Sequence, residues 1–199
     1  MRYDINSNIN FLNRTLDIPI IDEQIELCRQ GNAKAYHVIY NRYAKVMLNS
    51  SMRILDNLAD AEDMVQEAFV DAFKKLDSFT YKSPFEAWLR RIVINKSISF
   101  LRKKKSIWVD LTTVATADNS DDDRVDEDLF NYEVQRVKKA IEQLPENYKL
   151  VFNLYALDGL PQEEIGLLLG IAHNNVRIQY HRAKKKILEF LEKEVCYEN

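Results

Sequence analysis

Residues 160–187 read LPQEEIGLLLGIAHNNVRIQYHRAKKKI, a stretch with the layout of a helix-turn-helix. A short helix over 161–169 is predicted to end at Gly170, because only glycine enters the left-handed backbone region at little cost. Gly166 supplies the small side chain that a close crossing of two helices needs. The stretch therefore predicts two helices joined by a tight turn.

A basic helix is predicted to follow this turn. Ile171 and Val176 are expected to face the core, which leaves five residues facing outward: Arg177, Ile178, Gln179, His181 and Arg182. Five cations and no acid lie between residues 177 and 186, where they would neutralise DNA phosphates, and arginine can read guanine edges. The charge favours DNA recognition over the alternative, an ordinary hairpin of two helices.

Composition extends the helical prediction to the whole chain. The 199 residues include only four glycines and four prolines, too few for the tight turns and phosphate loops of all-β or Rossmann-type folds. Hydrophobic residues make up 46% of the chain and aromatic residues 11%, so it can bury real cores and global disorder is excluded. We predict an all-α protein, and the length allows two small domains.

The formal net charge of −3 gives no sign of a nucleic-acid partner, but it is the sum of opposed blocks. Residues 90–105 carry seven cations and no acid, whereas residues 118–128 carry seven acids and one cation. The acidic block lies in a segment without helical period, which is typical of a flexible linker. We therefore predict an N-terminal extension (1–20), a helical domain (21–105), a flexible acidic linker (106–132) and a second helical domain (133–195).

Apolar spacing predicts the first helices of the N-terminal domain. Residues 25–55 are expected to form one or two amphipathic helices with these core residues: Ile25, Leu27, Ala35, Val38, Ile39, Tyr43, Val46 and Met47. The next helix is expected to be capped by Asp60 and has the clearest apolar stripe: Ala61, Met64, Val65, Ala68, Phe69, Ala72, Phe73 and Leu76. Its other face, typical by itself of a solvated surface, carries Glu62, Asp63, Gln66, Glu67 and Asp71.

A further helix is predicted to begin at residues 83–86, SPFE, a capping box with proline at the first helical position. It is expected to run to residue 101, with a polar side that includes Arg91, Asn95 and Arg102. The second domain is expected to begin near Glu133 and to contain another proline-initiated helix at 144–147. Both domains are thus predicted to be helical.

Cysteine and histidine are too sparse to predict a metal site. The two cysteines, Cys28 and Cys196, and the three histidines lack the spacing of metal ligands, so we expect reduced thiols, no metal and no cofactor. No apolar run is long enough to span a bilayer, and the first residues lack the apolar stretch of a secretory signal. We expect a cytoplasmic protein without membrane insertion.

Both domains together resemble one family, the extracytoplasmic-function (ECF) sigma factors, the smallest members of the sigma-70 family of bacterial RNA polymerase. The resemblance covers about residues 22–193. GNAKAYHVIYNRYA from Gly31, DAEDMVQEAFVDAFKKLDSF from Asp60 and SPFEAWLRRIVINKSISFLRKKK from Ser83 look like successive parts of sigma region 2. IEQLPENYKLVFNLYALDGLPQEEIGLLLGIA and VRIQYHRAKKKI look like region 4. The resemblance implies a region 2 helical bundle and a region 4 helix-turn-helix in a factor that binds core RNA polymerase and directs promoter-specific initiation.

The resemblance implies tasks for the surfaces of region 2. The acidic helix would dock on the clamp coiled coil of the polymerase's largest subunit through Asp63, Gln66, Glu67 and Asp71. The loop 79–85 and the following helix would recognise and open the minus-ten element, with an unstacked base held by Tyr81, Lys82, Ser83, Phe85 and Asn95. Trp88 would line this pocket or, by its spacing with Leu89 and Ile92, belong to the core. Phosphates would be held by Arg91, Lys96, Arg102, Lys103 and Lys104.

Region 4 would read the minus-thirty-five element in the major groove. The residues expected to face this DNA are Asn174, Asn175, Arg177, Ile178, Gln179, His181, Arg182 and Lys185. The chain departs from the family's pattern at Ala172, where a serine commonly caps the recognition helix; Asn174 or Asn175 would replace that cap if the helix began later. Ile178 can contact a thymine methyl but cannot hydrogen-bond, so the preferred bases should differ from those of relatives.

Further partners and alternatives follow from the same comparison of motifs. The acidic linker would thread the polymerase channel, or act as a plain tether, and the polymerase flap and an anti-sigma factor are further expected partners. A free-standing helix-turn-helix regulator remains an alternative, although it leaves the acidic helix and residues 79–105 without a task. An enzyme acting on nucleic acid is the third class, but the sequence contains no phosphate loop, catalytic carboxylate pair or metal-ligand cluster, so no enzymatic activity is expected.

Overall fold

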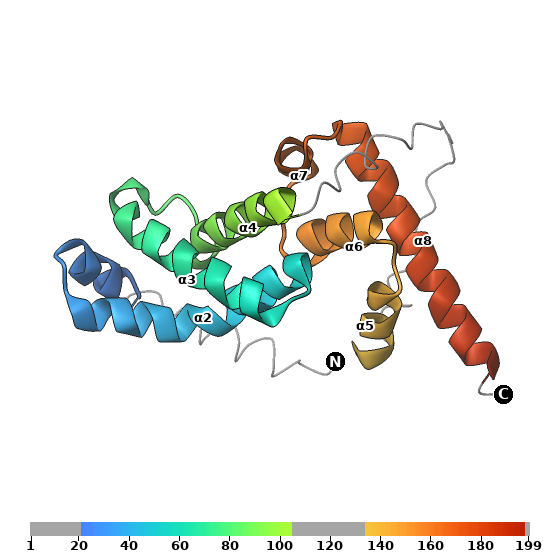
Figure 1. Ribbon diagram of the computed structural model, residues 1–199, viewed down its shortest axis with the longest axis horizontal. Coiled ribbons are helices and arrows are strands. Elements are labelled where there is room, and N and C mark those ends of the chain that lie inside the picture. Colours follow the sequence, from blue (N-terminus) through green and yellow to red (C-terminus); the bar gives the residue numbers. More distant parts are fainter. Residues whose placement is uncertain (1–20, 105–133, 198–199) are drawn as a thin grey trace, which may run out of the picture. The chain divides into compact units, whose positions relative to one another are not determined.

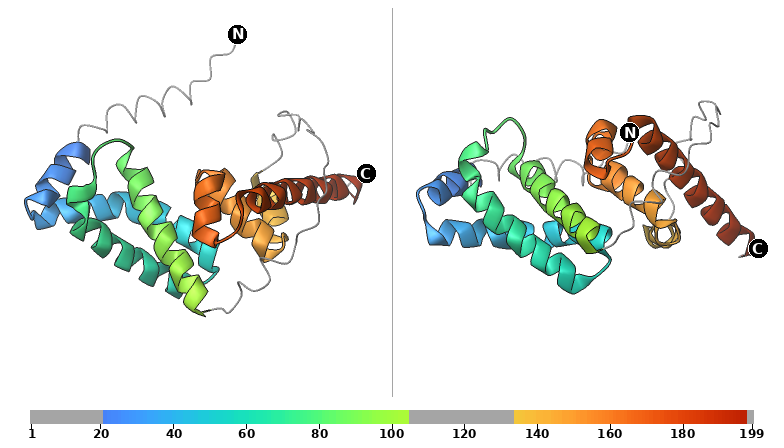
Figure 2. Two further views of the ribbon diagram at one scale, coloured as in Figure 1. Left: turned by 90° about the horizontal axis from the view of Figure 1, so that it is seen from above. Right: turned by 45° about the horizontal axis from the view of Figure 1, so that its top comes forward.

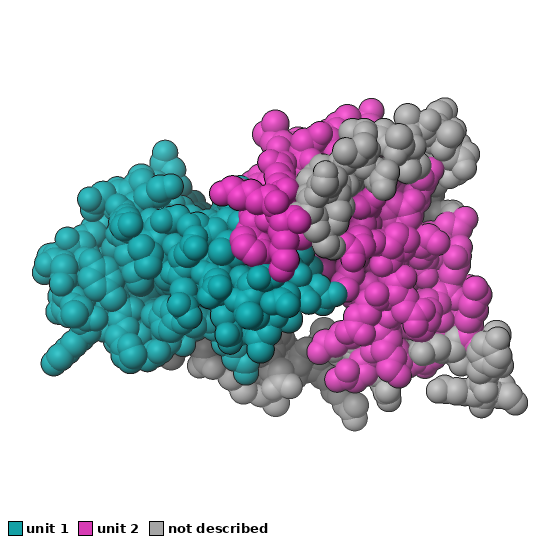
Figure 3. Space-filling model, viewed as in Figure 1, with its two compact units in different colours: residues 1–97 teal, residues 98–199 magenta. Residues whose placement is uncertain are grey.

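The computed structural model describes residues 21–104 and 134–197, with side chains for 21–104 and 135–193. These residues form helices and include no strand (Figure 1), which confirms the predicted all-α class. The chain divides into two compact units, residues 1–97 and 98–199 (Figure 3). The predicted N-terminal extension and acidic linker lie outside the described residues.

The first unit is built from a helix at residues 21–29, α2 (Ala33–Leu55), α3 (Leu58–Lys74) and most of α4 (Phe85–Lys104). A 3₁₀ turn, η1 (Leu76–Ser78), follows α3 and precedes the loop to α4. The chain turns between the first two helices at Gly31, whose φ of +79° lies in the left-handed region that glycine adopts without strain. The predicted helical segment 25–55 therefore forms two helices.

Asparagine side chains begin both α2 and α3. Asn32 Oδ1 accepts hydrogen bonds from the backbone N–H groups of Lys34 and Ala35, and Asn57 Oδ1 accepts one from the N–H of Asp60 at 3.0 Å. The prediction that Asp60 caps α3 is wrong, because the helix begins two residues earlier, at Leu58. Asp60 lies instead in the first turn, where its carboxylate interacts favourably with the helix dipole.

The start of α4 agrees with the predicted signal to within one residue. The carbonyl oxygen of Pro84 accepts hydrogen bonds from the N–H groups of Ala87 and Trp88 at 3.0 and 3.2 Å. Pro84 therefore stands directly before the helix, and Phe85 is its first residue. A shift of one residue is within the usual uncertainty of a helix end.

The core of the first unit follows the predicted stripes with two exceptions. Buried residues of α2 recur every fourth position at Ala35, Ile39, Tyr43 and Met47, and the stripe predicted for α3 is buried from Ala61 to Ala72, with Phe73 partly buried. The prediction that Val38 and Val46 are core residues is wrong, because they are 44% and 36% exposed. Each precedes a buried residue by one position, which turns it about 100° away from the core.

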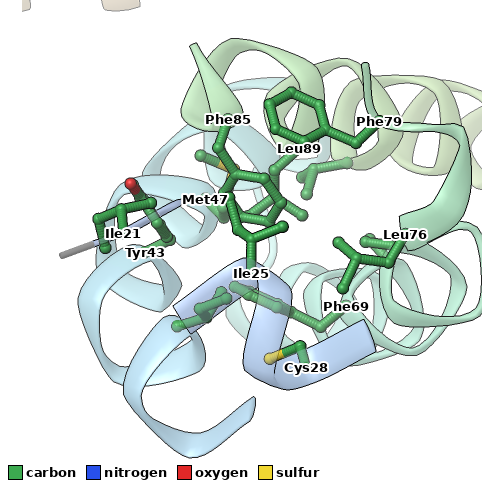
Figure 4. Packing of buried hydrophobic residues seen from close by; sticks show 14 of the residues in the cluster. Ile21, Ile25, Cys28, Tyr43, Met47, Phe69, Leu76, Phe79, Phe85 and Leu89 are labelled. Atoms are coloured by element: carbon green, nitrogen blue, oxygen red, sulfur yellow. The ribbon is translucent and has the colours of Figure 1, made fainter. Parts of the chain in front are cut away.

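Aromatic rings pack the end of this core where η1 leads into α4 (Figure 4). Phe79 meets Phe85 edge to face at 5.4 Å between ring centroids, and Trp88 lies 5.3 and 5.4 Å from these two rings. Tyr43 of α2 adds a fourth ring 5.6 Å from Phe85. Each such pair contributes about 0.5–1.5 kcal/mol beyond the area it buries. Trp88 is thus part of the core packing, which favours the core interpretation of its spacing.

The second unit contains α5 (Val134–Glu142), α6 (Glu146–Phe152), a π-helical turn η4 (Asn153–Leu157), α7 (Gln162–Leu169) and α8 (His173–Tyr197). Pro145 and Pro161 directly precede α6 and α7, as the proline signals predict. The long helix α8 packs against α5, α6 and α7. Its inward residues join a core that includes Ala140, Leu144, Phe152, Ala183, Ile187 and Leu191.

The structure confirms the roles predicted for Gly170, which follows α7, and for Gly166, which lies within α7. Gly170 ends α7 with a φ of +69°. A Cβ added to Gly166 would lie 3.0 Å from the carbonyl oxygen of Ile171 and 3.7 Å from Val176 of α8. Gly166 therefore permits the close approach of the two helices. No helix among the described residues combines the length and apolar character needed to cross a membrane.

Candidate nucleic-acid interface

Tyr81 lies in the loop that joins η1 to α4, in a backbone conformation that is uncommon for a residue with a side chain. Its φ is +59°, the residue is 42% exposed, and its ring centroid lies 4.7 Å from that of Phe79. The Tyr81 hydroxyl donates a hydrogen bond to Glu26 Oε1 at 2.6 Å. Desolvation, with this hydrogen bond, raises the pKa of Tyr81 to about 12. Tyr81 therefore presents a neutral aromatic ring at the surface.

The other residues predicted to hold a base lie in different environments. Lys82 is exposed and Ser83 half-buried in the same loop, and Asn95 is exposed on α4, where its Nδ2 donates to the Arg91 carbonyl at 2.8 Å. Phe85 is only 5% exposed, inside the aromatic core. The expectation that Phe85 contacts a base is therefore wrong, because its ring is packed against other rings of the protein. Figure 4 shows Phe85 among the buried side chains of this core, which also include Phe79.

The acidic face of α3 meets a cation of α4. Asp63, Gln66 and Glu67 are exposed, and Asp71 is half-buried. Lys96 Nζ lies 2.7 Å from Asp71 Oδ2 and 2.9 Å from Glu67 Oε2. The hydrogen bond with Lys96 lowers the pKa of Asp71, and the same contact raises the pKa of Lys96. Lys96, predicted to bind phosphate, thus neutralises two of the residues predicted to contact the polymerase.

The other cations of α4 that are predicted to bind phosphate are exposed. Arg91 is exposed in the first half of the helix, and the C-terminal end carries exposed Arg102, Lys103 and Lys104. Cations at a helix C-terminus are favoured by the dipole, so this placement is also locally stable. The predicted phosphate-binding residues other than Lys96 therefore include four exposed cations on one helix.

The outward face of α8 contains most, but not all, of the residues predicted for it. Asn174, Arg177, His181 and Lys185 are exposed, whereas Asn175, Ile178 and Arg182 are half-buried. Arg182 Nη1 lies 3.5 Å from the hydroxyl of Tyr148, a long contact at most. The helix begins at His173, and the carbonyl of Ala172 accepts from the N–H groups of Asn175 and Val176. Asn174 and Asn175 therefore lie inside the first turn, and the later start considered for a replacement cap is wrong.

Gln179 is the one residue of the predicted outward set that the structure buries. It is 7% exposed, and its Oε1 has no hydrogen-bond partner. Gln179 follows buried Val176 by three positions and precedes buried Ala183 by four, which is the spacing of a single helix face. The prediction that Gln179 faces DNA is therefore wrong, because Gln179 belongs to the core stripe of α8.

Two functional candidates were missed by the sequence. Arg29 and Glu26, on the helix at residues 21–29, contact the loop after η1 directly. Figure 2 shows this helix beside the loop that joins α3 to α4. The contacts join residues 47 to 55 positions apart, so no local pattern could have found them.

Known families and proteins match this chain along most of its length. Sigma-70 region 2 matches residues 39–107, and Sigma-70, region 4 matches residues 135–187. The ECF RNA polymerase sigma factor SigW of Bacillus subtilis (strain 168) is 31% identical over an alignment of 181 residues, and the match covers 84% of this chain and 95% of SigW. The ECF RNA polymerase sigma-E factor of Escherichia coli (strain K12) is 31% identical over an alignment of 175 residues, and the match covers 82% of this chain and 90% of that protein.

Solved structures agree with the fold. The structure of CnrH in complex with the cytosolic domain of CnrY has a TM-score of 0.50 at 24% identity, covering 85% of this chain and 96% of that one. The sigma factor RpoE in complex with the anti-sigma factor NepR from Bartonella quintana also has a TM-score of 0.50, at 23% identity, covering 80% and 98%. With both sigma regions present in order and relatives that match more than four fifths of its length, the chain belongs to the ECF sigma factors of the sigma-70 family, which direct promoter-specific transcription initiation by RNA polymerase.

Proposed function

We propose that residues 21–105 dock on core polymerase and open the minus-ten element, while residues 133–195 read the minus-thirty-five element. The observation that carries this proposal is the separation of exposed charge: α3 presents carboxylates opposite its buried stripe, and α8 presents cations opposite its own. Cations on a helix that follows a tight turn suit the major groove, and carboxylates suit a cationic protein partner.

The proposed polymerase contacts are the clamp coiled coil of the largest subunit, through Asp63, Gln66, Glu67 and Asp71, and the flap. For the minus-ten element we retain Tyr81, Lys82, Ser83, Arg91, Asn95, Arg102, Lys103 and Lys104. For the minus-thirty-five element we retain Asn174, Asn175, Arg177, Ile178, His181, Arg182 and Lys185. Lys96 is left out of the DNA set because it is held by two carboxylates.

We further propose how and where the chain acts. The chain has no enzymatic activity of its own and works in the cytoplasm, where core polymerase and promoter DNA are found. It is controlled by an anti-sigma factor. Support for the last point comes from the RpoE relative, which was solved with an anti-sigma factor bound. If the chain were a free-standing regulator, the exposed carboxylates of α3 would have no protein partner to bind.

Run-off transcription tests the proposal. Core polymerase is incubated with genomic promoter fragments, with and without the chain, and transcripts that depend on the chain are expected. Tight specific DNA binding by the chain alone, without any dependent transcript, would instead identify a free-standing regulator.

A charge reversal tests the assignment of α3. Asp63→Lys combined with Glu67→Lys is expected to lower the affinity for core polymerase by more than tenfold, because like charges then face each other. Fluorescence anisotropy of a labelled chain measures the affinity, and circular dichroism checks that the helices remain. Glu23→Lys reverses an exposed acid elsewhere in the same unit and is the control. Unchanged affinity of the double variant contradicts the assignment.

A further inference from the structure

The helix at residues 21–29 contacts the loop after η1, and the proposed function gives this helix no task of its own. Arg29 Nη2 donates to the carbonyl oxygen of Phe79 at 2.6 Å and to that of Leu76 at 3.3 Å. Its guanidinium also lies 5.4 Å from the centre of the Tyr81 ring. A planar guanidinium can bind two carbonyls and stack on a ring at once, whereas a lysine ammonium cannot. Arg29 therefore holds both the backbone and the side chain of the loop.

Glu26 completes the contact from the same helix. Its Oε1 accepts hydrogen bonds from the Tyr81 hydroxyl and from Arg29 Nη1, each at 2.6 Å. The left-handed φ of Tyr81 is one that side-chain-bearing residues adopt only where surrounding contacts hold them. The three side chains of Glu26, Arg29 and Tyr81 form one network, and the strained residue lies at its end.

The network leaves the ring of Tyr81 partly open. With 42% of the residue exposed, the ring offers a surface on which a planar group can stack. Phe79 packs beside it at 4.7 Å and limits its movement from within the core. An aromatic ring already fixed in place does not have to be ordered when a base arrives, so less binding free energy is lost.

We propose that Arg29 and Glu26 are positioning residues for promoter opening: they hold the Tyr81 ring so that one unpaired base of the minus-ten strand stacks on it. This inference rests on the proposed function of residues 79–105. It adds a task for the helix at 21–29, which lies ahead of the region 2 match at residues 39–107. The two residues act through Tyr81 and do not themselves touch the DNA.

The test is a double-mutant cycle, which compares the binding affinity of wild-type and variant protein for DNA with and without one base. Holoenzyme assembled from core polymerase and the full chain binds a fluorescent single strand of the minus-ten element from a promoter found by run-off transcription. Each base is replaced in turn by an abasic site. In the wild type, one replacement is expected to lower the affinity about tenfold, as stacking of one base on an aromatic ring would.

In the variants Arg29→Ala and Glu26→Ala, the same abasic replacement is expected to cost less than about threefold, because the ring is no longer held in place to stack. Glu23→Ala removes an exposed acid of the same helix; it is the matched control and should keep the full tenfold penalty. Arg29→Lys should fall between the wild type and Arg29→Ala. A purely structural role for Arg29 would lower the affinity at every position equally and leave the abasic penalty unchanged.

The outcomes separate this inference from the function on which it rests. A full abasic penalty in both Arg29→Ala and Glu26→Ala overturns the positioning role and leaves the proposed function intact. A wild-type holoenzyme that does not bind the single strand overturns both. Because Arg29→Ala removes several contacts, thermal unfolding is measured for each variant. If Arg29→Ala does not fold, two smaller changes decide the result: Glu26→Ala, which removes the acceptor shared by Tyr81 and Arg29, and Tyr81→Phe, which removes only the Tyr81 hydroxyl.

Discussion

The two basic helices, α4 and α8, carry similar runs of cations but differ in what surrounds those cations. On α4, Lys96 lies between Asp71 and Glu67, and Arg90 is paired with Glu86. On α8, Arg177, His181 and Lys185 are exposed on the face opposite the buried stripe. A basic run in a sequence is therefore not the same as a basic surface, because a neighbouring helix can supply carboxylates that neutralise part of it.

The largest effect is expected where the position of α8 itself is disturbed. Gly166→Val would place new atoms against the Ile171 carbonyl and the Val176 side chain, and such overpacking costs about 3 kcal/mol. Thermal unfolding should show the loss, and transcription from promoters that need the minus-thirty-five element should fall with it. The neighbouring Leu167 is 85% exposed, so Leu167→Ala is the control and should change stability little. Equal stability of the two variants would show that the helices do not need their close crossing.

Removing an exposed cation of α8 tests whether the exposed face of this helix binds DNA. Arg177→Ala is expected to lower transcription about tenfold from promoters with a minus-thirty-five element, because one arginine contact to a base is lost. Promoters that depend on the minus-ten element alone should be unaffected. Run-off transcription on matched templates with and without the upstream element measures the difference. An equal loss on both templates would mean that Arg177 acts through folding or polymerase binding.

Gln179 provides the buried counterpart on the same helix. Its Oε1 has no hydrogen-bond partner, so Gln179→Met, which keeps the shape of the side chain but removes the amide, is expected to stabilise the fold by about 1 kcal/mol. The preferred minus-thirty-five sequence should not change, and selection from a randomised promoter library measures it. A changed preference would show that Gln179 does contribute to reading the DNA.

The smallest effect is expected from Lys96→Met on α4. A partly exposed ion pair of this kind contributes about 1 kcal/mol or less, so the free energy of unfolding should change little. Association with core polymerase should become about twofold faster, because the α3 carboxylates lose their internal partner. The pKa of Asp71 is lowered in the folded chain, so the pair stabilises the wild type above the ordinary aspartate value of 3.8. That contribution is lost as pH falls through the lowered pKa. Denaturant unfolding should show the small difference between the two proteins at pH 7 and a smaller one at pH 2. Slower association with core polymerase would contradict the comparison.

Features that depend on neighbouring residues in the chain were predicted well. The glycine and proline signals correctly placed the turn at Gly170 and the starts of α6 and α7. The apolar stripe predicted for α3, with its spacing of three and four residues, was also correct. The cap of α3 was wrong because Asn57 and Asp60 are both good caps, and only the hydrogen bond from the Asp60 N–H to Asn57 decides between them.

The errors in the candidate site have two different physical causes. Gln179 could have been placed correctly from the sequence, because five of the six residues from 177 to 182 cannot all lie on one outward face of a helix with 3.6 residues per turn. Phe85 could not, because its burial depends on Tyr43, Phe79 and Trp88, which come from three different segments. Local periodicity specifies a face but not which distant rings cover it.

The sequence by itself determined the all-α class, the order of the two sigma regions and the membership of the ECF family, because helix caps, apolar periods and family motifs are written in neighbouring residues. Only the tertiary structure decided which charged side chains are available to bind a partner and which are paired within the chain. Lys96 meets Asp71 across 25 residues, and Tyr81 meets Glu26 across 55. Such pairings arise when helices pack, because packing brings together side chains whose separation along the chain carries no information about their distance in space.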